Sequence, residues 1–214
     1  MTTTHIYLIR HGESEGNRIH AFLGHTDLDI TDKGHEQAKK TAEYLKDIHA
    51  DVMYSSDLKR AYNTALHTAN EKGMEIIKSE GLREIYAGEW ENRLFEELAV
   101  EYEEPFRTWR ENIGFARCTG GESVAELQMR FVSELKRIKR AHEGETVFVF
   151  THATPIRVTK AAFDGISLED MKSIPWASNA SVTHVECVGE EYRVADYSID
   201  HFMQELLTAL PKNV

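Results

Sequence analysis

Apolar segments of strand length alternate with segments of helical periodicity along most of this chain. Three such strands are predicted, at His5 to Arg10, Val52 to Tyr54 and Thr146 to Thr151. Helical periods are found from Asp32 to Asp47, from Leu58 onward and from Glu122 to His142. This alternation predicts a three-layer α/β/α sandwich with a mostly parallel central sheet. A length of 214 residues suits one domain of this kind.

Other segments complete the predicted order. Thr154 and Pro155 favour the start of a helix, with the threonine as its N-cap. Two late strands, Ala180 to Val188 and Glu191 to Tyr197, are predicted to pair across Gly189. Between about residues 89 and 121 neither period is clear, and Glu, Trp and Arg are frequent. We therefore expect a single domain over residues 1–214, with a cap-like helical insertion at about 89–121.

Charge and cysteine content exclude several classes of function. The formal net charge of −11 disfavours binding to nucleic acids and to acidic membranes. No apolar run has the length of a membrane-spanning helix, and the first residues do not resemble a secretory signal. Cys118 and Cys187 are far apart and form no CxxC pair. These features predict a reduced, cytoplasmic protein, and they leave open whether it acts alone or as a homodimer.

Two of the predicted strands are followed directly by a histidine. His11 follows Arg10 and precedes a glycine, and His152 follows Thr151 directly before the predicted helix. Ligand sites in parallel sheets collect at the carboxyl ends of strands, so the two histidines are expected to share one site. An arginine beside a histidine suits a nucleophile next to an anion, although such a pair is also common on solvent-exposed surfaces that bind nothing. His152 is equally compatible with a purely structural cap.

Arg60 and Glu84 are two further candidates. Arg60 follows the carboxyl end of the strand near Tyr54, so it could bind the same anion, or it could be a solvated helix arginine. Glu84 could protonate a leaving oxygen, but it is one of 36 acidic residues and composition does not select it. Neither HExxH, a cysteine pair at ligand spacing, GxxxxGK[ST] nor GxGxxG is found, so no metal or nucleotide motif competes.

Several short blocks together resemble the histidine phosphatase superfamily, also called the phosphoglycerate mutase-like family. They run in that family's order over most of the chain. The blocks are Arg10-His11-Gly12-Glu13-Ser14 with Asn17, Gly24 with Asp27 and Leu28 to Gly34, Ser55 to Ala61, Leu82-Arg83-Glu84 with Gly88 and Trp90-Glu91, Gly121-Glu122-Ser123, and Thr151-His152.

The resemblance implies a phosphohistidine mechanism with no metal ion. His11 corresponds to the nucleophile that takes the phosphoryl group, and Glu84 to the proton donor for the leaving oxygen. For His11 to be neutral at its attacking nitrogen, its other nitrogen is expected to donate to a carbonyl such as that of Gly12. Proton transfer from Glu84 is expected to contribute roughly 10²–10⁴-fold to the rate.

The resemblance also implies which residues bind the phosphoryl oxygens. These are Arg10, Arg60, His152 and Asn17, with Gly24 and Ala153 as further phosphate- or substrate-binding positions. The chain departs from the family at two of these places. Leu23 precedes Gly24 where the mutases have Ser or Thr, and Ala153 replaces a glycine after the second histidine.

Within the family we favour a phosphatase acting on small phosphorylated metabolites. The alternative is a phosphoglycerate mutase, which would require 2,3-bisphosphoglycerate. The insertion is shorter than that of the mutases and has Arg107 and Arg110 three residues apart instead of an adjacent pair. A non-catalytic binding module on the same fold is a further alternative, but the residues that such proteins lose are present here.

The insertion is expected to carry substrate specificity. Five aromatic residues are candidates for an apolar or stacking wall, with attachment of the insertion to the core as the alternative: Trp90, Tyr102, Phe106, Trp109 and Phe115. Arg107, Arg110 and Arg117 either bind a second acidic group of the substrate or pair with nearby glutamates on a solvated face.

Overall fold

The computed structural model describes residues 2–209 and contains the predicted alternation of strands and helices. The strands are β1 (Thr3–Arg10), β2 (Ala21–Phe22), β3 (Val52–Ser55), β4 (Ile76–Lys78), β5 (Arg93–Leu94), β6 (Thr146–Thr151), β7 (Val182–Val188) and β8 (Glu191–Ile199). The α-helices are α1 (Glu15–Ile19), α2 (Asp32–Leu45), α3 (Lys59–Lys72), α4 (Phe95–Glu101), α5 (Glu103–Glu111), α6 (Val124–Ala141) and α7 (Ala153–Phe163).

Six strands form one sheet in the order β4-β3-β6-β1-β7-β8. The first four strands are parallel, with Ile9 of β1 paired to Phe150 of β6. The strand β7 runs antiparallel to β1, and β8 runs antiparallel to β7. The prediction of a mostly parallel sheet is therefore confirmed. Because β1, β3 and β6 are parallel neighbours, their carboxyl ends meet at one edge of the sheet.

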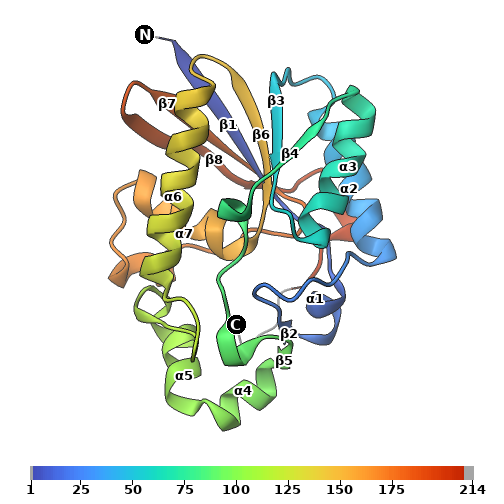
Figure 1. Cartoon of the computed structure of the whole chain (residues 1–214). Coiled ribbons are helices and arrows are strands. Elements are labelled where there is room, and N and C mark those ends of the chain that lie inside the picture. Colours follow the sequence, from blue (N-terminus) through green and yellow to red (C-terminus); the bar gives the residue numbers. More distant parts are fainter. Residues whose placement is uncertain (1, 210–214) are drawn as a thin grey trace.

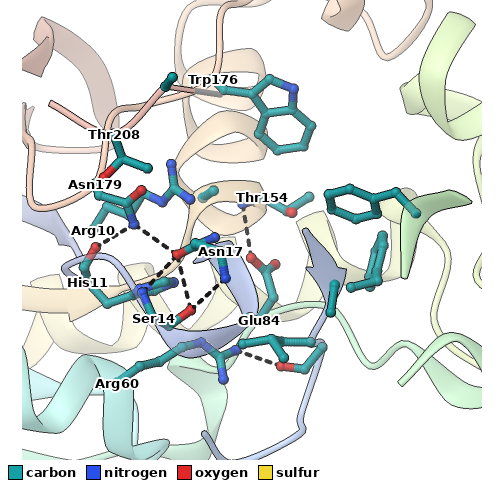
Figure 2. Close-up of a pocket in the computed structure, with 18 of the residues that line it drawn as sticks. Arg10, His11, Ser14, Asn17, Arg60, Glu84, Thr154, Trp176, Asn179 and Thr208 are labelled. Carbon is teal, nitrogen blue, oxygen red and sulfur yellow. Dashed lines mark hydrogen bonds between the residues drawn. The ribbon is translucent and has the colours of Figure 1, made fainter. Parts of the chain in front are cut away.

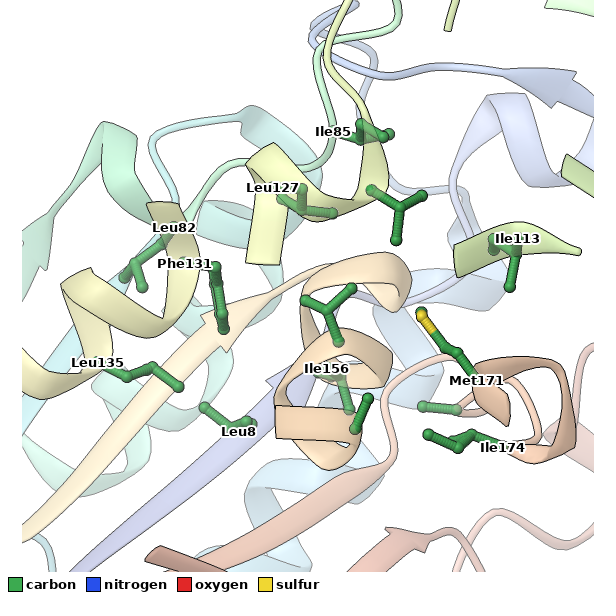
Figure 3. Packing of buried hydrophobic residues seen from close by; sticks show 14 of the residues in the cluster. Leu8, Leu82, Ile85, Ile113, Leu127, Phe131, Leu135, Ile156, Met171 and Ile174 are labelled. Atoms are coloured by element: carbon green, nitrogen blue, oxygen red, sulfur yellow. The ribbon is translucent and has the colours of Figure 1, made fainter. Parts of the chain in front are cut away.

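The sheet is covered by helices on both faces, as Figure 1 shows for α2 and α3 on one side and α6 and α7 on the other. Alternation along β6 divides its side chains between the two faces. Phe148 and Phe150 pack in the cluster that contains Leu45 of α2. Val147 and Val149 belong to the larger cluster beneath α6 and α7, part of which is drawn in Figure 3. The three-layer prediction is thus confirmed by two separate buried clusters.

The helix α6 forms where its pattern predicts. Ser123 is the N-cap, and its hydroxyl accepts from the backbone N–H of Glu126 in a capping box. The predicted inward residues are all buried: Val124, Leu127, Phe131, Leu135 and Ile138. This is an amphipathic helix with charged residues on its other face. Over the described range 2–209, no helix combines the length and the apolar character needed to cross a bilayer.

One predicted cap is wrong. The helix α7 begins at Ala153 rather than after Thr154, and His152 occupies the N-cap position without a side-chain cap bond. The backbone N–H of Thr154 instead points to a carboxylate oxygen of Glu84, at 3.3 Å. A group outside the helix therefore satisfies an N–H that a local cap would otherwise bind.

The segment 89–121 is mostly helical, as predicted, but it is anchored by a strand. In it β5 pairs antiparallel with the two-residue strand β2, which follows α1. Figure 1 shows α4 and α5 beyond β5, at the end of the molecule where α1 also lies. The short elements α1, β2, β4 and β5 were not predicted, because none is long enough to display a hydrophobic period.

Candidate active site

A pocket opens at the carboxyl ends of the central strands. Arg10 and His11 reach it from the end of β1, Arg60 from the first turn of α3, and Glu84 from the loop after β4. Figure 2 shows these side chains around one hollow together with Asn17. Parallel neighbouring strands thus bring together residues that are far apart in the sequence.

His11 is oriented as the resemblance implies. Its Nδ1 lies 2.7 Å from the carbonyl oxygen of Gly12, which can only accept, so Nδ1 carries the proton and Nε2 has a free lone pair. Burial, followed by the positive charges of Arg60 and Arg10, lowers the pKa of His11 well below 6.5. The ring is therefore a neutral base at physiological pH.

Gly12 is required by close packing. A Cβ at this position would lie 2.5 Å from the carbonyl oxygen of Gly34 in α2. The peptide that orients His11 is thus pressed against the start of a helix.

Arg10 and Arg60 place two buried guanidinium groups beside His11. Arg10 donates from Nη1 to the carbonyl of Ala177 at 2.5 Å, and its buried Nε has no protein partner among residues 2–209. Arg60 donates to the carbonyls of Thr26 and Gly24 at 2.8 and 2.7 Å. Burial lowers the pKa of each arginine to about 10, so both remain cations at neutral pH. Each retains N–H donors that can bind an anion.

His152 lies against His11, with the two ring centroids 5.3 Å apart. Its Nε2 is 2.9 Å from the hydroxyl of Ser56, while its Nδ1 is buried without a partner in the described part of the chain. The hydroxyl oxygen of Ser56 also accepts from the N–H of Leu58, so the hydroxyl can donate its own proton in a hydrogen bond to Nε2 of His152. In this arrangement Nδ1 carries a proton. Burial and the charge of Arg60 lower the pKa of His152 well below 6.5.

Asn17 is held with its amide nitrogen free. Its carbonyl oxygen accepts from Ser14 N–H, Ser14 hydroxyl and the amide of Asn179, at 3.1, 3.0 and 3.1 Å. The oxygen is thereby fixed, which leaves the NH₂ group as the available donor on the pocket side. The N-cap bond between Ser14 and Asn17 is also what begins α1.

Glu84 lines the pocket with a carboxylate held by backbone donors. One oxygen accepts from the N–H of Ile85 at 2.8 Å and the other from the N–H of Thr154. Its own carbonyl accepts from Arg130 and from the His25 ring, at 3.0 and 2.8 Å. Bonds to both the backbone and the side chain fix the position of this carboxyl group.

Gly24 and Ala153 both line the pocket. Gly24 has a φ of +51°, and a Cβ there would lie 2.5 Å from the Cβ of Ala87, so both conformation and space favour glycine. Ala153, at the first position of α7, is accommodated with 8% of its surface exposed.

Asn179 was missed as a site residue, and its position follows from the antiparallel strand. Its amide donates to the carbonyl of His11 and to Asn17, both at 3.1 Å. Because β7 runs antiparallel to β1, the start of β7 lies at the carboxyl end of β1. The sequence shows a late strand pair but not its direction, and direction is the signal that would have selected Asn179 and the nearby Trp176.

The predictions for the insertion are only partly confirmed. Of its five candidate aromatic residues, Trp109 lines the pocket. Trp90 and Phe106 are buried in the main core, and 60% of Phe115 is exposed. Arg107 pairs with Glu104 and Arg117 pairs with Glu126, each at 2.6 Å. These two arginines therefore lie in surface ion pairs with glutamates, which is the second of the two roles predicted for them.

The described residues contain one group of three side chains that could approach a metal ion: His5, His184 and Glu186. His5 lies in the first half of β1, whereas the pocket lies beyond the end of that strand. The site around His11 instead has its positive charge from arginine.

The neutral state of His11 predicts a loss of stability in acid. In the unfolded chain a histidine takes up a proton near pH 6.5, whereas the folded protein keeps His11 neutral. Below that pH the unfolded state binds more protons, so the free energy of unfolding falls. At pH 5.5 this costs about 1.4 kcal/mol for one histidine.

The prediction can be measured by urea unfolding at pH 7.5 and 5.5. The wild type should lose about 1.4 kcal/mol more than the His11→Gln variant over this interval. The wild type and the variant have all other titrating groups in common, so the effects of those groups cancel when the two losses of unfolding free energy are subtracted. Equal losses in the two proteins would contradict a neutral, buried His11.

Comparison with known proteins agrees with this geometry. The model of the histidine phosphatase superfamily (branch 1) matches residues 6–200. Phosphoserine phosphatase 1 of Hydrogenobacter thermophilus is 39% identical over 183 residues, which cover 85% of this chain and 86% of the relative. The metal-independent phosphoserine phosphatase of Arabidopsis thaliana is 31% identical, over 87% of this chain and 85% of the relative.

A solved structure agrees as well. Bacillus stearothermophilus YhfR superposes with a TM-score of 0.90 at 29% sequence identity, over 94% of this chain and 99% of that one. The similarity thus extends over both layers of helices and the sheet between them.

Proposed function

The chain belongs to branch 1 of the histidine phosphatase superfamily, and on this premise we propose that it hydrolyses small phosphomonoesters through a phosphohistidine on His11. The observation that carries the proposal is the neutral imidazole of His11 beside two buried guanidinium groups. A neutral Nε2 can attack phosphorus, and the fixed cations offset the charge of the group that it attacks.

Four side chains are proposed to bind the phosphoryl oxygens, and we call them the phosphoryl-binding group: Arg10, Arg60, His152 and Asn17. The unpartnered Nε of Arg10 and Nδ1 of His152 support this role, because buried N–H groups normally have an acceptor. A phosphoryl oxygen would supply one. Ser56 already holds the ring of His152, and Asn179 already holds the amide of Asn17. These two donors therefore need no reorganisation when negative charge develops on the phosphoryl oxygens.

In the first step Nε2 of His11 forms a bond to phosphorus as the ester P–O bond breaks. The leaving oxygen takes a proton from the carboxyl group of Glu84 and departs as the alcohol. Nδ1 of His11 keeps its proton and continues to donate it to the Gly12 carbonyl oxygen in a hydrogen bond. This bond stabilises the positive charge that develops on the ring. The products are the alcohol, phosphohistidine and the carboxylate of Glu84.

In the second step water attacks the phosphorus of the phosphohistidine. The carboxylate of Glu84 takes a proton from this water as the N–P bond breaks. Inorganic phosphate is released, and His11 and the Glu84 carboxyl group return to their starting states.

No metal or organic cofactor is proposed for this reaction. Arg10 and Arg60 supply the positive charge that a divalent ion supplies in many phosphoryl-transfer sites. The similarity to a metal-independent phosphatase supports the same view. A bound 2,3-bisphosphoglycerate would be needed only by a mutase.

The setting of the reaction is proposed from the whole chain. We place the enzyme in the cytoplasm, where its two buried thiols, Cys118 and Cys187, would stay reduced. Its partner is a small phosphorylated metabolite and not a nucleic acid, because the chain carries a net charge of −11. We treat residues 1–214 as one catalytic domain with segment 89–121 as a cap.

Release of phosphate in the presence of EDTA tests the proposed function. The panel contains p-nitrophenyl phosphate, O-phosphoserine, sugar phosphates and 3-phosphoglycerate. We expect EDTA-resistant hydrolysis of at least one ester. Interconversion of 3- and 2-phosphoglycerate with negligible hydrolysis would instead identify a mutase and overturn the proposal.

A further inference from the structure

The pocket has an aromatic side that the mechanism does not use. Its lining includes Phe22, Phe95, Trp109 and Trp176, which we call the aromatic wall. These rings come from β2, the start of α4, α5 and the loop before β7. Figure 2 shows Trp176 and Glu84 across the hollow from His11. The aromatic wall therefore belongs to the part of the site that meets the leaving group.

The aromatic wall is one packed unit. Phe22 contacts Trp109 edge to face, with the centroids 4.8 Å apart, and it also contacts Phe95 at 6.2 Å. Trp109 and Trp176 stack with their centroids 6.1 Å apart. The guanidinium of Arg157 lies 4.3 Å from the ring of Trp176 and holds it in place. A preformed apolar surface of this kind binds a ligand without having to collapse first.

Leu23 extends this apolar surface of the pocket. It lines the pocket and packs against Gly16, whose absent side chain makes room for it. A Cβ on Gly16 would lie 2.4 Å from the Leu23 side chain. Leu23 thus adds apolar area to the pocket next to Phe22 in the sequence.

The charges of the pocket are concentrated on the phosphoryl side. Among its lining residues, as far as the structure describes them, the charged side chains are Arg10, Arg60 and Glu84. All three have roles in the proposed phosphoryl transfer. Of the three candidates for a second acidic group, Arg107 and Arg117 are paired on the surface, and Arg110 is exposed and outside the pocket lining. A carboxylate or ammonium on the leaving group would lose hydration against the aromatic wall, and the lining within residues 2–209 has no further charged side chain to replace that hydration.

We infer that the preferred leaving group is an uncharged alcohol carrying an aromatic or bulky apolar group, which packs on the aromatic wall. The inference rests on the proposed phosphatase function and names its substrate class. It separates this chain from its phosphoserine phosphatase relatives, because phosphoserine carries both a carboxylate and an ammonium on the leaving group.

Three primary alkyl phosphates test the inference: 2-phenylethyl phosphate, ethyl phosphate and O-phosphoserine. All three release a primary alcohol, so the comparison reports binding of the leaving group and avoids the intrinsic reactivity of aryl esters. We expect kcat/KM for 2-phenylethyl phosphate to exceed the other two by at least about tenfold, because a buried phenyl group gains far more than a methyl group.

Variants locate the effect. In Trp176→Ala the ratio of kcat/KM for 2-phenylethyl phosphate to that for ethyl phosphate should fall about tenfold, and Trp176→Phe should restore most of it. Phe115→Ala is the control, since Phe115 is an exposed aromatic residue of segment 89–121 that lies outside the pocket. Its ratio should equal that of the wild type. The ratio cancels any loss of folded protein.

The outcomes distinguish the two proposals. If neither these three esters nor any ester of the EDTA panel is hydrolysed, the proposed function fails. If only esters of the EDTA panel other than O-phosphoserine are hydrolysed, the phosphatase stands and the inference about the leaving group is overturned. If esters are hydrolysed but O-phosphoserine or ethyl phosphate is used as well as 2-phenylethyl phosphate, the phosphatase stands and the inference about the leaving group is overturned. An unchanged ratio in Trp176→Ala would also overturn it.

Discussion

His11→Ala is expected to abolish hydrolysis, lowering kcat/KM by about 10⁴-fold or more, because the variant has no atom that can take the phosphoryl group. The phosphoryl-binding group is intact in this variant and should still bind inorganic phosphate or vanadate. Measuring phosphate release together with phosphate binding therefore separates loss of the nucleophile from loss of the site.

The matched control for this variant is His201→Ala. His201 is exposed and lies outside the pocket lining, so its removal should leave turnover unchanged. Turnover by His11→Ala within about tenfold of the wild type would exclude His11 as the nucleophile.

Glu84→Gln should lower kcat/KM by roughly 10²–10⁴-fold for an alkyl phosphate. The amide keeps an oxygen for the N–H of Ile85 but carries no proton that it can give to an alkoxide. The loss should be much smaller for p-nitrophenyl phosphate, because nitrophenolate is stable as an anion and leaves without a proton. Steady-state kinetics with both esters measure the difference.

Glu89→Gln serves as the control for charge. Glu89 is an exposed carboxylate in the next turn of the loop, where it accepts from the hydroxyl of Tyr102. It should retain wild-type rates with both esters. Equal losses for the alkyl and nitrophenyl esters in Glu84→Gln would contradict a role for Glu84 as the proton donor.

The parallel core of the fold could be predicted because its signals are local. The apolar centre of β6 and the stripe on α6 each lie within one segment of sequence. The same is true of the placement of His11 and His152, since each directly follows a strand that could be predicted. Arg60 and Glu84 needed the resemblance, because their own segments carry no signal that separates them from other arginines and glutamates.

The rest depends on contacts between distant segments. Asn179 reaches the carbonyl of His11 only because β7 runs antiparallel to β1, and no residue near position 179 encodes that direction. The aromatic wall likewise combines residues that are far apart, such as Phe22 and Trp176. Trp90 and Phe106 belong to the same segment as Trp109, but their side chains are buried in the hydrophobic core. The reason is that segment 89–121 buries one face of its short helices.

Trapping of the phosphorylated enzyme is the most direct test of the proposed mechanism. The enzyme is quenched in alkali within milliseconds of mixing with a ³²P-labelled ester, and the labelled peptide is then mapped. We predict a phosphoryl group that is stable to base and labile to acid, located on His11 and absent from His11→Ala. Rapid turnover with no label on His11, or with the label on another residue, would contradict the account.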